Sequence, residues 1–304
     1  FCWGDPARRT RPAARTAARG LSAATSRLWL PRAALTTCVR GVMARNTLGV
    51  PLPPERRFNH FPATPLCSIS WWFEGSSEML PRGAPATLDT PRSLLPSRII
   101  FGGPHTGPSC SWNPGGVHGM MLLLMPDAVH RLTGLDIAAW VDRFAPAREV
   151  LPDPWVAVCE AVLARPESAD GSGADADPHR QDDLRVARLQ DFLDPLWQAA
   201  RPARPMQAHR YQDWARSLAL HAATSGAGRS LRQVERRIKQ WAGLPMRELR
   251  GMGRAEQAFF EGLASAEVGQ SPRWTDVAQA SGYADQSHLC RETRRITGFT
   301  PDEL

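Results

Sequence analysis

The sequence predicts an α+β protein, in which a β-rich N-terminal domain is followed by an all-α C-terminal domain. Residues 51–152 are dense in Pro and Gly and contain short apolar runs, a pattern typical of strands between turns. In residues 206–304, apolar side chains recur instead at helical spacing. This second region also contains an internal repeat with a period of 55 residues, which predicts two matching helical units.

The length of the chain allows two domains, and the distribution of charge indicates which of them would bind an acidic partner. The chain has 304 residues, enough for two hydrophobic cores, and a net charge of +7. Residues 1–42 contain eight Arg and one acid, so the rest has 29 basic and 29 acidic residues. Within that rest, residues 206–304 carry +3 and residues 43–205 carry −3. The charge therefore favours the C-terminal third, and only weakly.

Residues 1–42 are Arg/Ala-rich and nearly free of acids, and we expect them to be disordered. Their composition is typical of an organellar transit peptide, and also of an upstream region translated in error. A third alternative is a basic arm that contacts nucleic-acid phosphates. We favour Met43 as the physiological start, which places a β-rich sensory or dimerisation domain at residues 43–165.

Three apolar runs in this domain predict strands, namely Leu66–Phe73, Arg98–Phe101 and Gly119–Met125. The sequence shows no catalytic constellation. Its histidines are scattered without the HxH and downstream Glu of a cupin-type metal site, and nucleophile-elbow and P-loop motifs are missing. We therefore expect no enzyme activity, no metal and no cofactor. Trp71, Trp72 and Trp112 either pack in the core or line a ligand pocket.

The six cysteines lie far apart, without a CxxC motif or a zinc-finger spacing, which favours free thiols in a reducing cytoplasm. The longest apolar run is too short to span a bilayer, which needs about 20 residues. Residues 166–183 are acidic and Gly/Ser-rich, so residues 166–205 read as a linker followed by a helix. That helix would place Leu184, Leu189, Phe192, Leu193 and Leu196 on one face.

The repeat matches residues 220–246 with residues 275–301. The 55-residue shift aligns Ala223 with Ala278, Arg236 with Arg291, and Gly243 with Gly298. A small residue, a turn glycine and a later docking apolar residue are what two closely crossing helices require. Residues 246–265 between the copies predict a helix of roughly 22–30 Å, long enough to hold two helix-turn-helix units about one DNA turn apart.

Two segments carry a resemblance to a known family. The segment "GRSLRQVERRIKQWAG" (Gly228 to Gly243) and the segment "GYADQSHLCRETRRITGFTP" (Gly282 to Pro301) are similar to the two signatures of AraC/XylS-type transcription regulators. The resemblance implies a cupin-like N-terminal domain and a C-terminal DNA-binding domain over residues 206–304. In that domain, the second helix of each unit would enter the major groove of promoter DNA.

The sequence departs from this pattern in several places. The first turn reads "SGAG", Pro245 comes one position early, and the chain ends at Leu304, early for the family. Thr293 stands where the family has a buried Phe. We therefore expect less stringent reading by the first unit and looser packing of the last helix.

By matched position, the resemblance assigns base reading to Arg232, Glu235 and Arg236 in the first unit and to Gln286, Ser287 and Arg291 in the second. The chemistry agrees, because Arg pairs with guanine, Gln with adenine, and Glu accepts from cytosine. Phosphate contacts, which set register and salt dependence, are expected from six other residues. These are Arg229, Arg237, Lys239, His288, Arg294 and Arg295.

The sequence therefore predicts a cytoplasmic bacterial transcription regulator that binds double-stranded promoter DNA. A small-molecule effector, a homodimer and a contact with RNA polymerase are further expectations of the resemblance, and no membrane association is expected. Two alternatives stay open. One is a DNA-repair or alkyl-transfer protein with the same module, and the other is an interaction module whose repeat no longer binds DNA.

Overall fold

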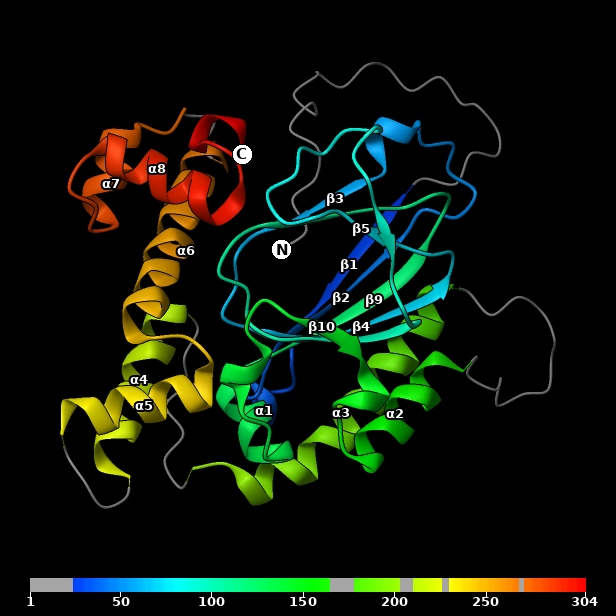
Figure 1. Cartoon of the computed structure of the whole chain (residues 1–304), viewed down its shortest axis with the longest axis horizontal. Helices are drawn as coiled ribbons and strands as arrows, with labels where there is room; N and C mark the ends of the chain where they lie inside the picture. The colour runs from blue at the N-terminus through cyan, green and yellow to red at the C-terminus, as the bar shows by residue number, and fades with distance from the viewer. Residues whose placement is uncertain (1–23, 165–177, 203–209, 226–229, 268–270) are drawn as a thin grey trace.

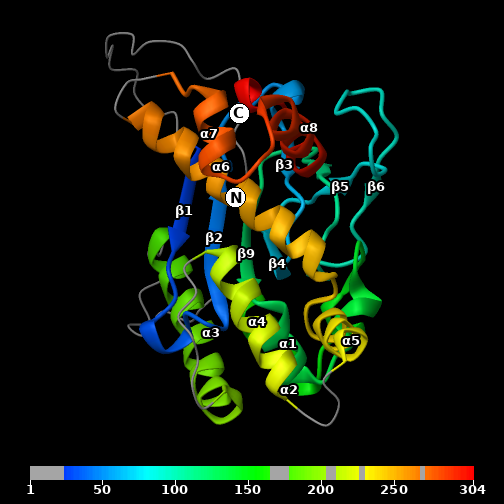
Figure 2. The same cartoon turned by 90° about the vertical axis from the view of Figure 1, so that its left-hand side faces the viewer.

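The computed structural model of the chain describes residues 24–164, 178–202, 210–225, 230–267 and 271–304. Its N-terminal part is built on two antiparallel sheets, and its C-terminal part is helical (Figure 1). The long helix α6 (Met246–Glu267) runs alongside the β-rich domain and carries a pair of helices at each end (Figures 1 and 2). The predicted α+β class and domain order are confirmed.

The larger sheet has six strands in the order β1-β2-β9-β4-β7-β10. Its central strand β9 (His118–Leu124) alternates buried and half-buried side chains, as expected when one face of a strand covers a core. The predicted runs 66–73, 98–101 and 119–125 correspond to β4, β7 and β9. The other strands of this sheet are β1 (Thr25–Trp29), β2 (Val39–Asn46), β4 (Cys67–Glu74), β7 (Ile99–Gly102) and β10 (Phe144–Pro146).

The smaller sheet has four strands in the order β3-β8-β5-β6. Its strands are short and include polar residues, so the apolar pattern did not reveal them. Their bounds are Phe58–Phe61 for β3, Ser109–Trp112 for β8, Glu78–Met79 for β5 and Ser93–Leu94 for β6.

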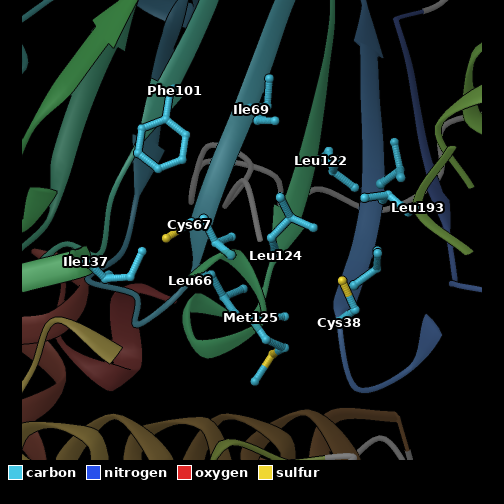
Figure 3. Close-up of a cluster of buried hydrophobic side chains, with 14 of the residues drawn as sticks. Cys38, Leu66, Cys67, Ile69, Phe101, Leu122, Leu124, Met125, Ile137 and Leu193 are labelled. Carbon is cyan, nitrogen blue, oxygen red and sulfur yellow. The ribbon is translucent and has the colours of Figure 1, made fainter. Parts of the chain in front are cut away.

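The hydrophobic core lies where helices cover the larger sheet (Figure 3). Phe101, Leu122 and Leu193 are at most 1% exposed, and they come from β7, β9 and α3. Trp71 is also in the core, and its indole nitrogen donates to the carbonyl of Cys159 at 3.0 Å. The helices of this domain are α1 (Pro126–Thr133), α2 (Asp153–Leu163) and α3 (Pro178–Ala200), with 3₁₀ turns at Ala33–Leu35, Pro54–Arg56, Ile137–Trp140 and Ala147–Glu149.

The expectation that residues 1–42 are disordered is wrong for residues 25–42. Strand β1 pairs with β2, and Met43, the expected domain start, lies inside β2 opposite Leu28. Leu35, Cys38 and Val42 are at most 1% exposed, so this segment supplies part of the core. The Arg/Ala composition hid these strands, because their apolar residues are few and separated by arginines. Residues 1–23 lie outside the described part.

The expectation of a linker and a helix at residues 166–205 also needs correction, because α3 belongs to the β-rich domain. Its buried face holds Val186, Leu189, Leu193 and Trp197, whereas Leu184 and Leu196 are 49% and 38% exposed. The predicted face was therefore rotated around the helix. Residues 165–177 lie outside the described part.

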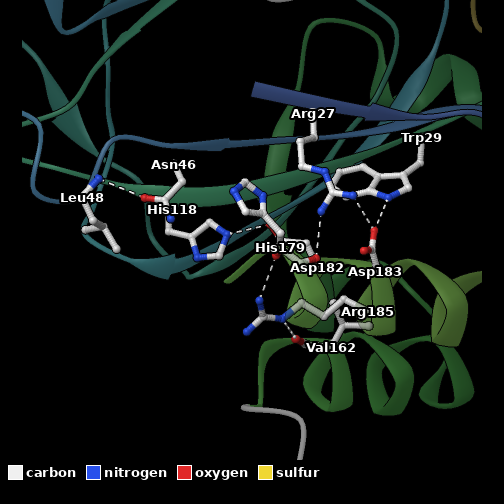
Figure 4. A network of polar contacts seen from close by, with 10 residues as sticks. All are labelled: Arg27, Trp29, Asn46, Leu48, His118, Val162, His179, Asp182, Asp183 and Arg185. Atoms are coloured by element: carbon white, nitrogen blue, oxygen red, sulfur yellow. Dashed lines mark hydrogen bonds and ion pairs between the residues drawn. The ribbon is translucent and has the colours of Figure 1, made fainter. Parts of the chain in front are cut away.

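A buried polar network fixes α3 to the sheet (Figure 4). The carboxylate of Asp182 lies 3.1 Å from Nε2 of His118 on β9 and 3.0 Å from Nη1 of Arg185. The Arg185 guanidinium also covers the ring of Phe73 at 3.7 Å. All three polar side chains are nearly inaccessible, so their mutual contacts offset the cost of burying these polar groups.

Candidate nucleic-acid interface

The second helical unit is made by α7 (Trp274–Ala280) and α8 (Gln286–Thr297). The turn between them needs Gly282, whose φ of 73° is in the left-handed region. Asp285 is the N-cap of α8, and its carboxylate accepts a hydrogen bond from the backbone nitrogen of His288 at 2.6 Å. Leu289 is 1% exposed and docks the helix. The second unit therefore has the turn glycine and the docking apolar residue that the repeat predicts, together with a capped helix start.

The first unit is made by α4 (Tyr211–Thr224) and α5 (Leu231–Ala242). Helix α5 begins at a capping box, in which Ser230 and Gln233 satisfy each other's backbone nitrogens. Helices α5 and α8 both have 12 residues and differ by 55 positions at both ends. The repeat seen in the sequence is therefore a repeat of structure at the second helix of each unit.

The two units differ in their first helices. The buried small residue of α4 is Ala222 at 0% exposure, not the exposed Ala223 that the 55-residue shift selects. Its partner in α7 is Ala278 at 1% exposure, which corresponds to a shift of 56 residues. The first turn is therefore one residue longer than the second, and the alignment of Ala223 with Ala278 was wrong.

An exposed stripe runs along each second helix. Arg232, Arg236 and Lys239 are exposed on α5, with the 4- and 3-residue spacing that keeps side chains on one helix face. Ser287, Arg291 and Arg294 are exposed at the matching positions of α8. We call these sets the α5 stripe and the α8 stripe. Five of their six side chains are cationic.

Helix α6 connects the two helical units. It has 22 residues, so it is about 33 Å long at 1.5 Å per residue. One turn of B-form DNA repeats at about 34 Å, a length comparable to that of α6.

Two expected base-reading residues make contacts inside the protein. The Glu235 carboxylate accepts from the backbone nitrogen of Met246 at 3.2 Å and so caps the first turn of α6. Gln286 is exposed, and its side-chain oxygen accepts from the hydroxyl of Thr275 at 3.2 Å. In this arrangement Glu235 has a structural role, whereas Gln286 keeps its amide NH₂ group on the exposed side of α8.

Three of the expected phosphate-binding side chains are also engaged. Arg237 donates to the carbonyl of Ala222 at 2.7 Å, which ties α5 to the end of α4. His288 is half-buried beside the Tyr283 ring, with the ring centroids 5.3 Å apart. Arg295 pairs with Glu292 at 3.1 Å and with Glu248 at 3.4 Å. Arg229 lies outside the described residues.

The pairing of Arg295 with Glu292 changes the acidity of both groups. Its hydrogen bonds lower the pKa of the Glu292 carboxyl below its usual value and raise the pKa of Arg295. A second nitrogen of Arg295 lies 3.5 Å from the carbonyl of Thr106 in the β-rich domain. Arg295 therefore joins α8 to α6 and to the N-terminal domain.

Leu231 is a further candidate for contact with DNA, and the sequence alone did not indicate it. It is the first residue of α5 and is 88% exposed, and it occupies the position that matches Gln286 in α8. The sequence did contain a signal for this role, because Leu231 is apolar where the other copy has the polar Gln286. Apolar side chains at the N-terminus of such a helix can contact the methyl group of thymine.

The C-terminal ends of α5 and α8 pack against the β-rich domain. Gly243 follows α5 and lies against Ile137 and Val141, and its φ of 77° is in the left-handed region. At the end of α8, the Ile296 carbonyl accepts from the backbone nitrogen of Ala63 at 2.7 Å. The domains are therefore in contact at two matched helix ends.

Three further observations on the described residues concern metal ions, thiols and membranes. Among the described residues, no three His, Cys, Asp or Glu side chains are grouped to hold a metal ion. Burial raises the pKa of Cys110 to about 11 and of Cys159 to about 12, which keeps these thiols protonated at neutral pH. No described helix is long and apolar enough to cross a membrane.

Comparison with known proteins gives one family match and several distant structural likenesses. Residues 263–304 match the family described as bacterial regulatory helix-turn-helix proteins, AraC family. No curated protein matches the chain.

Solved structures of ToxT from Vibrio cholerae are similar in outline. An apo ToxT variant has 11% identity and a TM-score of 0.38, over 93% of this chain and 96% of that one. A second ToxT structure has 11% identity and a TM-score of 0.35, over 93% and 97%. YcfD, a ribosomal oxygenase from Escherichia coli, has 13% identity and a TM-score of 0.20, over 61% and 51%.

Proposed function

We propose that this chain, whose C-terminal segment 263–304 is an AraC-family helix-turn-helix, is a sequence-specific transcription regulator that places α5 and α8 in successive major grooves of promoter DNA. The observation that carries the proposal is the match between the α5 stripe and the α8 stripe. Similar cationic rows at the same helical positions of two units joined by α6 are suited to the repeated major groove of a DNA duplex.

The roles of the side chains follow from their chemistry and exposure. Arg232, Arg236 and Arg291 would grip guanine O6 and N7 with two hydrogen bonds each. Ser287 and the free amide hydrogens of Gln286 would read neighbouring bases. Lys239 and Arg294, nearer the C-terminal ends of the helices, would contact phosphates and fix the register. Arg237, Arg295 and Glu235 would instead support the two units through the contacts described above.

The remaining partners are proposals of the same kind. We expect a small-molecule effector to bind in the N-terminal part, and we expect a homodimer and a contact with RNA polymerase in a cytoplasmic setting. The two alternative functions make different demands. A repair protein needs a reactive acceptor thiolate, and burial raises the pKa of four described cysteines, which opposes that chemistry. An interaction module would not need cationic stripes.

The test is selection of bound duplexes from a random pool with the full chain, followed by affinity measurements at several salt concentrations. We expect an enriched site with two half-sites about 10 base pairs apart, and an affinity that falls steeply with salt. An interaction module would enrich no sequence. Binding without half-sites, or binding insensitive to salt, would contradict the proposal.

A further inference from the structure

A pocket of about 670 Å³ lies between the β-rich domain and the second helical unit. Met43, Phe61 and Leu123 line it from the β-rich domain. Met252 and Phe259 of α6 and Ile296 of α8 line it from the other side. Ligand pockets of small molecules have volumes of roughly 300–1,000 Å³ and mostly apolar walls, so both the size and the lining suit a ligand.

Thr293 helps to open this pocket. It is 8% exposed, it lies on the wall of the pocket, and it occupies the α8 position that matches Ile238 of α5. Ile238 fills its own site and is 2% exposed. A threonine is smaller than the isoleucine of the first unit, and smaller than the phenylalanine expected there from the family resemblance. The missing side-chain volume leaves space beside α8.

The charged groups in the buried part of the pocket balance one another. Glu256 has a side chain that is 6% exposed, and its Oε1 lies 2.7 Å from Nη2 of Arg40. Its Oε2 accepts from the backbone nitrogen of Tyr211 at 2.6 Å. Both carboxylate oxygens are therefore occupied, and the Arg40 guanidinium lies over the Tyr211 ring at 5.3 Å.

The other acids of the lining lie at the exposed end of the pocket. Asp302 accepts from the indole nitrogen of Trp274 at 2.5 Å, and Glu303 accepts from the backbone nitrogen of Thr300 at 2.6 Å. These acids add negative charge, so the lining repels an anion, while Glu256 already neutralises the nearest arginine. A carboxylate ligand would have to displace Glu256 or remain unpaired, and both are costly in an apolar site.

We infer that this pocket binds an uncharged, largely apolar small molecule that contacts both domains at once. This deepens the effector part of the proposed function, although binding to the pocket is measurable without DNA. Since the lining includes α6 and α8, an occupant would be linked to the position of the second unit and hence to its affinity for DNA.

A second pocket of about 780 Å³ lies between the strands and shares Arg40, Met43 and Phe61 with the first. Thr293 and Ala255 line the pocket between the domains and not the second one. Substitutions at these two positions therefore distinguish the sites.

The test uses two fluorescent probes with the full chain, uncharged Nile red and anionic 1-anilinonaphthalene-8-sulfonate. We expect Nile red to bind one site, and the anionic probe to bind at least about tenfold more weakly. Thr293→Phe fills the pocket from α8 and Ala255→Phe fills it from α6. Each is expected to weaken Nile red binding at least about tenfold, because the added ring occupies the same volume.

Thr224→Phe is the matched control, because Thr224 is exposed on α4 and lies outside both pockets. It should leave Nile red binding unchanged. Circular dichroism and thermal unfolding show whether each filling variant folds. If one of them does not fold, the Nile red affinity of the other variant tests the site. Equal Nile red affinity in the wild type and in both folded filling variants would overturn the assignment of the site.

Glu256→Gln tests separately whether the pocket prefers uncharged ligands, because it removes the negative charge of Glu256 beside Arg40. We expect this variant to gain affinity for the anionic probe and so to narrow the gap between the two probes. A wild type that binds the anionic probe as tightly as Nile red would overturn the uncharged class. Loss of DNA binding with intact probe binding would count against the proposed function and not against this site.

Discussion

Arg236 and Arg291 occupy the same position in two matched helices. Each is the sixth residue of a 12-residue helix that begins after a side-chain N-cap and ends at a glycine with positive φ. Both side chains are exposed, and α6 separates the two helices. Equivalent guanidinium groups are thus presented at the same position of two helices, which is expected of a surface that reads DNA with two units.

The first prediction concerns these two residues. Arg236→Ala and Arg291→Ala should each lower affinity for the selected site by about 1–3 kcal/mol and relax the base preference at one position. The two positions should fall in different half-sites. Because the residues lie in different helical units, the losses should add in the double variant. Fluorescence anisotropy with a panel of single-base-pair variants of the site measures all three quantities.

Arg216→Ala is the control for charge alone, since Arg216 is exposed on α4 and lies outside both stripes. It should leave the base preference unchanged. If both stripe variants keep the wild-type base preference, α5 and α8 do not read the sequence in the proposed way.

A second prediction separates phosphate contacts from base reading. Lys239→Ala and Arg294→Ala should weaken binding almost equally for all sequences. Each should lower the slope of log affinity against log salt by about 0.9, the value for one phosphate contact on duplex DNA. Titrations between low and moderate salt measure the slope. An unchanged slope in both variants would remove these residues from the DNA-contacting surface.

The repeat shows why part of the structure was predictable from the sequence. Helix α5 and helix α8 were predicted because an arginine, an apolar docking residue and a terminal glycine recur at one spacing. The turn of the first unit was not predicted correctly, because Ala222 packs there and Ala223 does not. The sequence does not show that this turn is one residue longer, and only the burial of the two alanines reveals it.

Tertiary contacts decided the remaining differences. Strands β1 and β2 are stabilised by pairing across the sheet, which their Arg-rich composition does not indicate. Glu235 and Arg295 are residue types that can contact DNA. In the structure, however, Glu235 bonds to α6, and Arg295 bonds to α6 and to the β-rich domain. The pocket beside Thr293 is likewise a property of two domains that are distant in sequence.

A third prediction follows from the lowered pKa of Glu292. An acid with a lowered pKa in the folded state stabilises that state above its unfolded pKa, and the contribution is lost as the pH falls through the folded value. Glu292→Gln should therefore reduce the free energy of unfolding at neutral pH. The difference from wild type should shrink as the pH falls below about 4. Urea unfolding at a series of pH values measures it, and a difference independent of pH would exclude an ionic origin.

A fourth prediction concerns the start of α8. Asp285→Ala removes the acceptor for the His288 backbone nitrogen and should cost about 1 kcal/mol of stability. Asp285→Asn keeps an acceptor at that site and should recover most of the loss. Both variants should lower DNA affinity in proportion to fraying of the helix and leave the base preference intact. A changed base preference would instead mean that Asp285 contacts a base.

The last prediction concerns Leu231, an 88% exposed leucine at the start of α5. Exposure of this apolar side chain to water is unfavourable, but in the major groove it would contact the methyl group of a thymine. Replacing single thymines of the selected site by deoxyuridine removes only that methyl group. One position in the α5 half-site should then lose about 0.8 kcal/mol, the value of one buried carbon, with the wild-type protein. Leu231→Ala should show no such loss, whereas the same loss in both proteins would assign the thymine contact to another residue.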